Sequence, residues 1–184
     1  MRTFVAIDLN PEIKAVLSSL VRTLRQTKAE VKWVSENSFH LTLKFLGEIA
    51  EKDLGPIVSA LEAEARKSEP FSLECRSTGY FPPKGSPRVI WAGVVPSPEL
   101  MDLQRRLEIA FEKLGFAREA RDFHPHLTLG RVKSSRHLET ALRVLKQYED
   151  KSFGQMEVKA ITLFESILRP QGAEYRVMKE VKLG

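Results

Sequence analysis

The sequence predicts an α+β fold of two similar lobes, with internally duplicated antiparallel sheets, helices on the outer faces and a central cleft. The first reason is a repeat: the tetrapeptide His-Leu-Thr-Leu occurs at residues 40–43 and again at 126–129. The second is that strand-like and helix-like apolar patterns follow the same order in both halves. Shifting the first half by the spacing of the repeat also superimposes further identical residues, which are Arg2 on Arg88, Ala6 on Ala92 and Leu17 on Leu103. We therefore expect a single domain, 1–184, with pseudo-symmetric halves at about 1–82 and 87–184.

The first half is expected to run strand, helix, two strands, helix, strand. Residues 4–9 form an apolar strand, and Asn10-Pro11 marks a helix start because Asn caps helices and Pro suits the first turn. The apolar residues of that helix lie on one face, at Ile13, Val16, Leu17, Leu20, Val21 and Leu24. The remaining elements of this half are strands at 31–34, 39–46 and 71–80 and a helix carrying Leu54, Ile57, Val58 and Leu61.

The second half repeats this order after a junction at 81–87. A β-rich strand at 88–95 precedes Ser97-Pro98, a second cap followed by proline. The helical stripe that follows consists of Leu103, Leu107, Ala110, Phe111 and Leu114. The rest is a strand at 126–132, a helix with Leu138, Ala141, Leu142 and Leu145, and a terminal hairpin of 158–168 and 175–181 turning at Pro170-Gln171-Gly172.

Composition restricts the classes of protein to consider. With 42% hydrophobic and 29% charged residues, the chain has an ordinary globular composition, and its net charge of +5 favours an anionic partner. The single cysteine, Cys75, excludes an intramolecular disulfide and fits a reducing cytoplasm. The apolar run at the N-terminus stops at Asp8, too short for a membrane span, so no membrane partner is expected. Internal duplication supplies the symmetry of a dimer, which favours a monomer.

The doubled His-x-Thr pattern suggests the chemistry. In a strand, residues two apart share a face, so His40 lies beside Thr42 and His126 beside Thr128. Two imidazoles can exchange protons near neutral pH, and two hydroxyls can donate hydrogen bonds to an anion. Attack on a phosphodiester needs a base for the incoming oxygen and an acid for the leaving oxygen. The four side chains therefore suit phosphodiester cleavage without a metal or another cofactor.

Arg131 is a candidate phosphate ligand whose direction depends on whether the strand stays regular after Gly130. It lies five residues after His126, so strand alternation alone places it on the opposite face. A turn or bulge after Gly130 would bring its guanidinium to the cleft, where it would bind phosphate through two parallel hydrogen bonds. The alternative is a solvated arginine beside a loop.

These residues also carry a family resemblance. The doubled motif and the segments 2–7, 40–47, 88–92 and 124–131 resemble the 2H phosphoesterases, most closely the RNA 2′,3′-cyclic phosphodiesterases that are also called 2′-5′ RNA ligases. The resemblance covers almost the whole chain. It implies a bilobal fold, metal-free opening of an RNA-terminal 2′,3′-cyclic phosphate to a 2′-phosphomonoester, and weak reverse joining of tRNA halves through a 2′-5′ bond.

The resemblance also implies a role for each residue. His40 would be the proton donor to the departing 3′ oxygen, and His126 the proton acceptor that activates water. Thr42 and Thr128 would hold the phosphate oxygens, and Arg131 would contact the substrate. The partner would be an RNA with a 2′,3′-cyclic phosphate end or a small cyclic or 2′-5′ nucleotide.

Other side chains are weaker candidates. Aromatic residues stack on bases in single-strand sites, although most strand aromatics are core residues; the candidates are Phe4, Trp91, Tyr80 and Phe81. Cations that would make the cleft basic, or simply lie at solvated strand ends, are Arg2, Lys44, Lys84 and Arg88.

Two other functions remain open at this point. One is a noncatalytic RNA-binding module with a basic cleft, and the other is a metallohydrolase that uses His124 and His126 as ligands. The sequence also leaves open whether the substrate is a tRNA half, a 2′-5′ oligoadenylate or an ADP-ribose cyclic phosphate, and which direction of the reaction matters.

Overall fold

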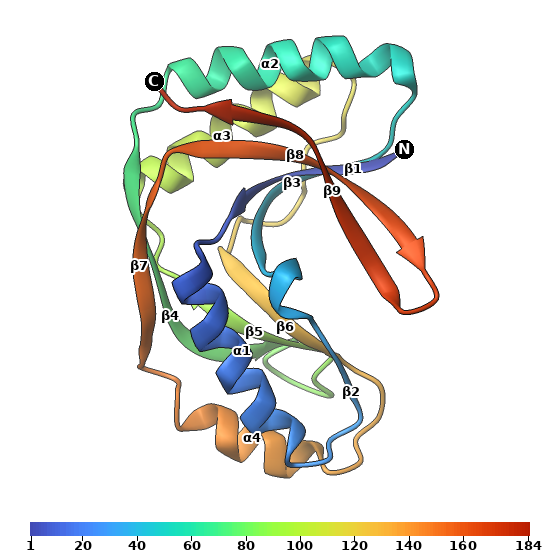
Figure 1. The fold of residues 1–184 in the computed structure, drawn as a ribbon, viewed down its shortest axis with the longest axis vertical. Coiled ribbons are helices and arrows are strands. Elements are labelled where there is room, and N and C mark those ends of the chain that lie inside the picture. Colours follow the sequence, from blue (N-terminus) through green and yellow to red (C-terminus); the bar gives the residue numbers. More distant parts are fainter.

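The computed structural model, which describes residues 1–184, contains two antiparallel sheets (Figure 1). The first sheet has four strands in the order β3-β1-β8-β9, which are β3 (His40–Glu48), β1 (Arg2–Asp8), β8 (Ala160–Arg169) and β9 (Gly172–Lys182). The second has five in the order β2-β6-β5-β4-β7, which are β2 (Val31–Trp33), β6 (His126–Val132), β5 (Val89–Val94), β4 (Phe71–Phe81) and β7 (Ser152–Val158). The α+β class with antiparallel sheets is therefore confirmed.

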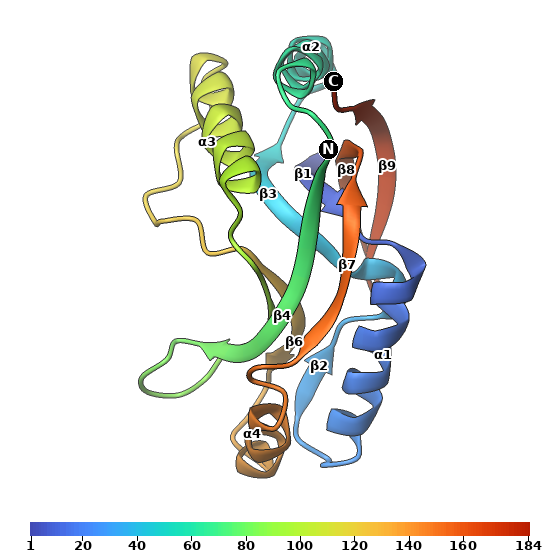
Figure 2. The ribbon, with the colours of Figure 1, turned by 90° about the vertical axis from the view of Figure 1, so that its left-hand side faces the viewer.

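Two helices cover each sheet, and two of the four helices follow a strand of one sheet but pack against the other sheet. Helices α2 (Leu54–Arg66) and α3 (Pro98–Lys113) pack on the first sheet, at the opposite end of the molecule from α1 (Pro11–Arg25) and α4 (Leu138–Lys146) (Figure 2). Helix α1 follows β1 of the first sheet yet packs against β7 of the second, and α3 follows β5 of the second sheet yet packs against β3 of the first. None of the four helices is both long enough and apolar enough to cross a bilayer.

Each sheet takes strands from both halves of the sequence. Strands β2 and β4 precede the junction but belong to the second sheet, whereas β8 and β9 follow it but belong to the first. The pairs that carry the repeated motif remain equivalent, because β1 pairs with β3 as β5 pairs with β6. The two motifs therefore lie in different sheets, and β3 and β6 are in contact with each other.

The expected helix starts are confirmed, and one strand was missed. The side chain of Asn10 accepts a hydrogen bond from the amide of Ile13 at 2.9 Å, and that of Ser97 accepts one from Leu100 at 3.2 Å. Strand β7 was not expected because only Phe153 and Val158 are buried in it, which gives no sustained alternation. The terminal hairpin is confirmed; β8 begins two residues later than expected, and β9 is longer than expected at both ends.

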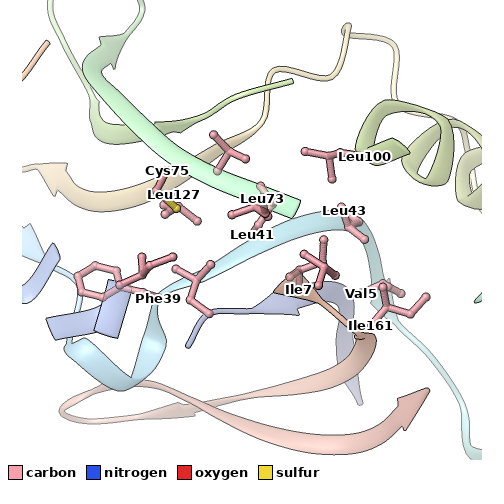
Figure 3. Packing of buried hydrophobic residues seen from close by; sticks show 14 of the residues in the cluster. Val5, Ile7, Phe39, Leu41, Leu43, Leu73, Cys75, Leu100, Leu127 and Ile161 are labelled. Atoms are coloured by element: carbon pink, nitrogen blue, oxygen red, sulfur yellow. The ribbon is translucent and has the colours of Figure 1, made fainter. Parts of the chain in front are cut away.

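One continuous core cluster explains why the motif histidines reach the surface. It contains 36 buried residues, contributed by both sheets and all four helices. The leucines of both motifs point into it, and Figure 3 shows Leu43 near Val5 and Leu127 beside Cys75. Because side chains alternate along a strand, the His and Thr of each motif point away from this core.

Candidate active site

A β-bulge in β6 decides the direction of Arg131. Thr128 lies opposite Trp91 on β5 and Arg131 lies opposite Val89, which leaves Leu129 as the extra residue. Since Trp91 and Val89 are two positions apart on one strand, Arg131 shares the face of the polar motif residues despite its odd spacing. Of the two alternatives for Arg131, the structure supports the bulge, which lies at Leu129 rather than after Gly130.

Strand β3 has the same bulge at the equivalent position. Thr42 lies opposite Ala6 and Lys44 lies opposite Val5, so Leu43 is the extra residue, as Leu129 is in β6. The bulge sends Lys44 to the core face and returns Phe45 to the face of the motif. Phe45 therefore corresponds to Arg131 in the repeat, and its side chain is 68% exposed.

The expectation that Lys44 makes the cleft basic is wrong. Its side chain is on the opposite face and only 6% exposed. Its ammonium donates to a carboxylate oxygen of Glu108 at 3.1 Å and to the carbonyl of Ala117 at 2.6 Å, and the same carboxylate oxygen accepts from the amide of Glu119. This buried pair fastens α3 and β3 to the loop that leads into the second motif.

His40 lies among aromatic rings in the first sheet. Its ring centroid is 4.8 Å from that of Phe4, 5.0 Å from that of Tyr175 and 6.0 Å from that of Phe164. Burial lowers the pKa of His40 to about 4, although a backbone hydrogen bond with Ser38 opposes the shift. His40 is therefore uncharged at neutral pH in the free protein.

Two charged groups close to His40 act on its pKa in opposite directions. Asp8 lies opposite His40 across the β1–β3 pair and raises its pKa, but the ammonium of Lys14 lies 2.8 Å from the Asp8 carboxylate and lowers it. Desolvation is therefore the main influence on this imidazole.

A backbone carbonyl two residues earlier orients the His126 ring. Its Nδ1 lies 2.7 Å from the carbonyl oxygen of His124, and because a carbonyl only accepts, Nδ1 carries the hydrogen of this bond. In the neutral ring, Nε2 then has a free lone pair. A pocket of about 220 Å³ adjoins this histidine and is lined by Phe81, Trp91, His124, Pro125 and His126.

The aromatic candidates separate into two groups. The ring centroid of Phe81 is 5.0 Å from that of His126, in an edge-on arrangement, and 5.4 Å from that of Trp91. Phe81 and Trp91 both line the pocket. The Trp91 ring also lies against Gly79, where an added Cβ would come within 2.3 Å of it, so only glycine leaves room for the ring. Phe4, in contrast, is 3% exposed and has no free face for a base; it supports His40. Tyr80 packs against the core.

One side chain connects the two sheets at the site. Tyr175 of β9 contacts His40. Burial raises the pKa of Tyr175, and the positive charges of Arg131 and Arg2 oppose this rise. Arg131 belongs to β6 of the second sheet, so it lies within electrostatic reach of the His40 environment. Tyr175 was not identified from the sequence, because nothing in a terminal hairpin indicates which sheet it joins.

The remaining predicted residues are two cations and one further histidine. Lys84 and Arg88 are exposed and form no ion pair, and Lys84 lies in the loop after β4. His124 lines the pocket, and no group of three or more His, Cys, Asp or Glu side chains is arranged to bind a metal.

Known proteins resemble the whole chain. The model of the family described as LigT like phosphoesterase matches residues 7–91 and 94–175. A Methanothermobacter thermautotrophicus protein named RNA 2′,3′-cyclic phosphodiesterase is 36% identical over 183 residues, which are 100% of this chain and 99% of the relative. A crystal structure from Thermus thermophilus covers 100% of this chain and 98% of its own, at 30% identity and a TM-score of 0.85. The structure of E. coli LigT complexed with 3′-AMP covers 99% and 97%, at 25% identity and a TM-score of 0.73.

Proposed function

Because the chain belongs to the LigT-like phosphoesterase family, we propose that it opens 2′,3′-cyclic phosphates at RNA ends to 2′-phosphomonoesters, using two histidines and no metal. The name of the M. thermautotrophicus relative supports this reaction, and the E. coli complex with 3′-AMP supports a site for a terminal nucleotide. His40 and His126 are the proposed acid and base.

The observation that carries the proposal is the matched bulge in β3 and β6. Strand alternation before the bulge puts the His and Thr of each motif on the face away from the core, and the bulge adds Arg131 to that face in β6. Strands β3 and β6 touch, and the charge of Arg131 reaches Tyr175 beside His40. Cleavage of a phosphodiester requires one group that accepts a proton, one that donates a proton, and a positive charge that stabilises the phosphate oxygens.

In the proposed reaction, Nε2 of His126 takes a proton from water as the water oxygen attacks phosphorus. The bond from phosphorus to the 3′ oxygen breaks, and His40 gives that oxygen a proton. The hydroxyls of Thr42 and Thr128 and the guanidinium of Arg131 bind the other phosphate oxygens. The product is a 2′-phosphomonoester with a free 3′ hydroxyl.

The protonation of His40 is coupled to substrate binding in this scheme. The free imidazole is uncharged because burial lowers its pKa to about 4. A phosphodiester anion placed against the ring favours the charged form and raises the pKa. The donor is therefore loaded when substrate is present, and in the reverse direction the two histidines exchange roles.

We also propose a nucleobase-binding surface, a ligation reaction and a cellular location. Trp91, with Phe81, would stack on a base in the pocket beside His126. Reversal with a ribose hydroxyl in place of water would join RNA ends, such as tRNA halves, through a 2′-5′ bond. The buried free thiol of Cys75 suits a reducing cytoplasm, and we propose a monomer there.

The test is incubation of the protein with an RNA ending in a 2′,3′-cyclic phosphate, in excess EDTA, with the product identified by ³¹P NMR. A 2′-monophosphate is expected, and His40→Ala or His126→Ala should each lower the rate by about 10² to 10⁴. Unchanged substrate at high enzyme concentration contradicts the proposal. Activity lost in EDTA indicates a metallohydrolase, and salt-dependent RNA binding without turnover indicates a binding module.

A further inference from the structure

The terminal hairpin brings a tyrosine into the group of rings around His40. Tyr175 lies on β9, and its ring meets His40 at 5.0 Å with an interplanar angle of 89°. It also meets Phe4 at 5.3 Å and 82°. Since Phe4 is 4.8 Å from His40, the three rings contact one another in a closed triangle.

The hairpin is built to hold this ring in place. Strands β8 and β9 form the hairpin seen in Figure 1. They pair along their whole length, with Tyr175 opposite Ser166 and Val177 opposite Phe164. Near the turn the hairpin approaches β2 of the second sheet, since a Cβ added at Gly172 would lie 3.9 Å from the Lys32 ammonium. The hairpin therefore reaches from one sheet to the other beside the site.

We propose that Tyr175 is a positioning residue for the reaction, whose ring fixes the orientation of the His40 imidazole and keeps water from one side of it. The inference rests on the proposed function, because it assigns a purpose to the surroundings of the proposed proton donor. Phe4 and Tyr175 together hold the imidazole between fixed surfaces, and a proton donor must be held in a narrow range of directions to act.

The electrostatics agree with this geometry. Removing water from an imidazole disfavours its charged form, and desolvation is the largest cause of the lowered pKa of His40. The charged groups that act on His40 are Asp8 and Lys14, and those that act on Tyr175 are Arg131 and Arg2. Removing the Tyr175 ring leaves these charges in place and admits water, so the pKa of His40 should rise.

The decisive comparison uses Tyr175→Phe, which keeps the ring, and Tyr175→Leu, which removes it. For Tyr175→Leu we expect kcat on the cyclic phosphate to fall about tenfold or more, with a smaller change in KM. For Tyr175→Phe we expect kcat within about twofold of the parent, because its ring fills the same place. Leu168→Ala is the matched control, since Leu168 lies on the same hairpin but is 76% exposed.

A second measurement does not depend on turnover. Titration of the histidine ring signals by NMR should give a pKa of about 4 for His40 in the parent and in Tyr175→Phe. In Tyr175→Leu it should move toward about 6.5, the value of an unperturbed histidine. Circular dichroism establishes that each variant is folded, and Tyr175→Met replaces Tyr175→Leu if the latter unfolds.

Each outcome has one meaning. The proposal is overturned if the ring-free variant keeps both the parent pKa of His40 and the parent kcat, or if Tyr175→Phe loses as much activity as Tyr175→Leu. If no variant or parent opens the cyclic phosphate but the pKa of His40 follows the ring, the positioning holds and the proposed substrate is wrong.

Discussion

The guanidinium of Arg131 is the one permanent cation that the bulge in β6 turns to the face of the motif. A planar fork binds two phosphate oxygens at once, which an ammonium cannot do. We therefore predict that Arg131→Lys lowers kcat/KM about tenfold and that Arg131→Gln lowers it about a hundredfold, as measured with the cyclic phosphate substrate.

The control for this series is Arg143→Gln, which removes the same charge from the exposed side of α4. It should leave kcat/KM unchanged. Equal losses in Arg131→Gln and Arg143→Gln would mean that net charge alone acts on the RNA, and that Arg131 has no direct contact with phosphate.

Single residues also show where sequence reasoning succeeded. Alternation within His-Leu-Thr-Leu placed His and Thr on one face, and each motif leucine lies in the core. The same rule failed two residues later, because a bulge reverses the alternation and sends Lys44 inward and Phe45 outward. A bulge depends on pairing with a neighbouring strand, and no signal within the strand itself reveals it.

At the scale of elements, the buried pair of Lys44 and Glu108 joins β3, α3 and the loop before β6. Removing one partner leaves an uncompensated buried charge. We predict that Lys44→Met lowers the free energy of unfolding by about 3 to 5 kcal/mol, measured by urea denaturation. It should also speed hydrogen exchange of the Glu119 amide, which donates to the same carboxylate.

Lys52→Met is the control, because Lys52 is exposed and forms no ion pair. Its free energy of unfolding should change by less than about 0.5 kcal/mol. If Lys44→Met is as stable as Lys52→Met, the pair contributes nothing to the fold. The loop would then need another anchor.

Most elements could be predicted because their local signals agree. Helices α1 and α3 have the predicted N-cap and proline, and most of each predicted apolar stripe is buried, whereas Val16 and Leu114 are exposed. Strand β7 lacks such a signal, and the sheet to which each strand belongs cannot be read from a local pattern. The position of the β8–β9 hairpin beside the site, and with it that of Tyr175, depends on which sheet these strands join.

For the whole molecule, the burial of His40 links stability to pH. The unfolded chain binds a proton near pH 6.5, whereas folded His40 binds it near pH 4, so protons favour unfolding between these values. We predict that the free energy of unfolding falls as the pH drops through this window, by at most about 1.4 kcal/mol per pH unit for this one group.

Comparison with His40→Gln isolates this contribution. The carboxylates with lowered pKa, Glu64 and Asp102, remain in both proteins and cancel in the difference. The variant should lose less stability than the parent between pH 6.5 and 4, as followed by urea denaturation. Parallel curves for the two proteins would show that His40 is not buried in the neutral form.

The position of β1 has a consequence for how the protein is made. This strand lies between β3 and β8, and β8 begins only at Ala160. A nascent chain on the ribosome has therefore produced its first strand long before one of that strand's neighbours exists. We expect stalled chains that end before Ala160 to be digested readily by protease, and chains with Lys182 outside the exit tunnel to resist it. Resistance in the shorter chains would mean that the sheet closes without its last two strands.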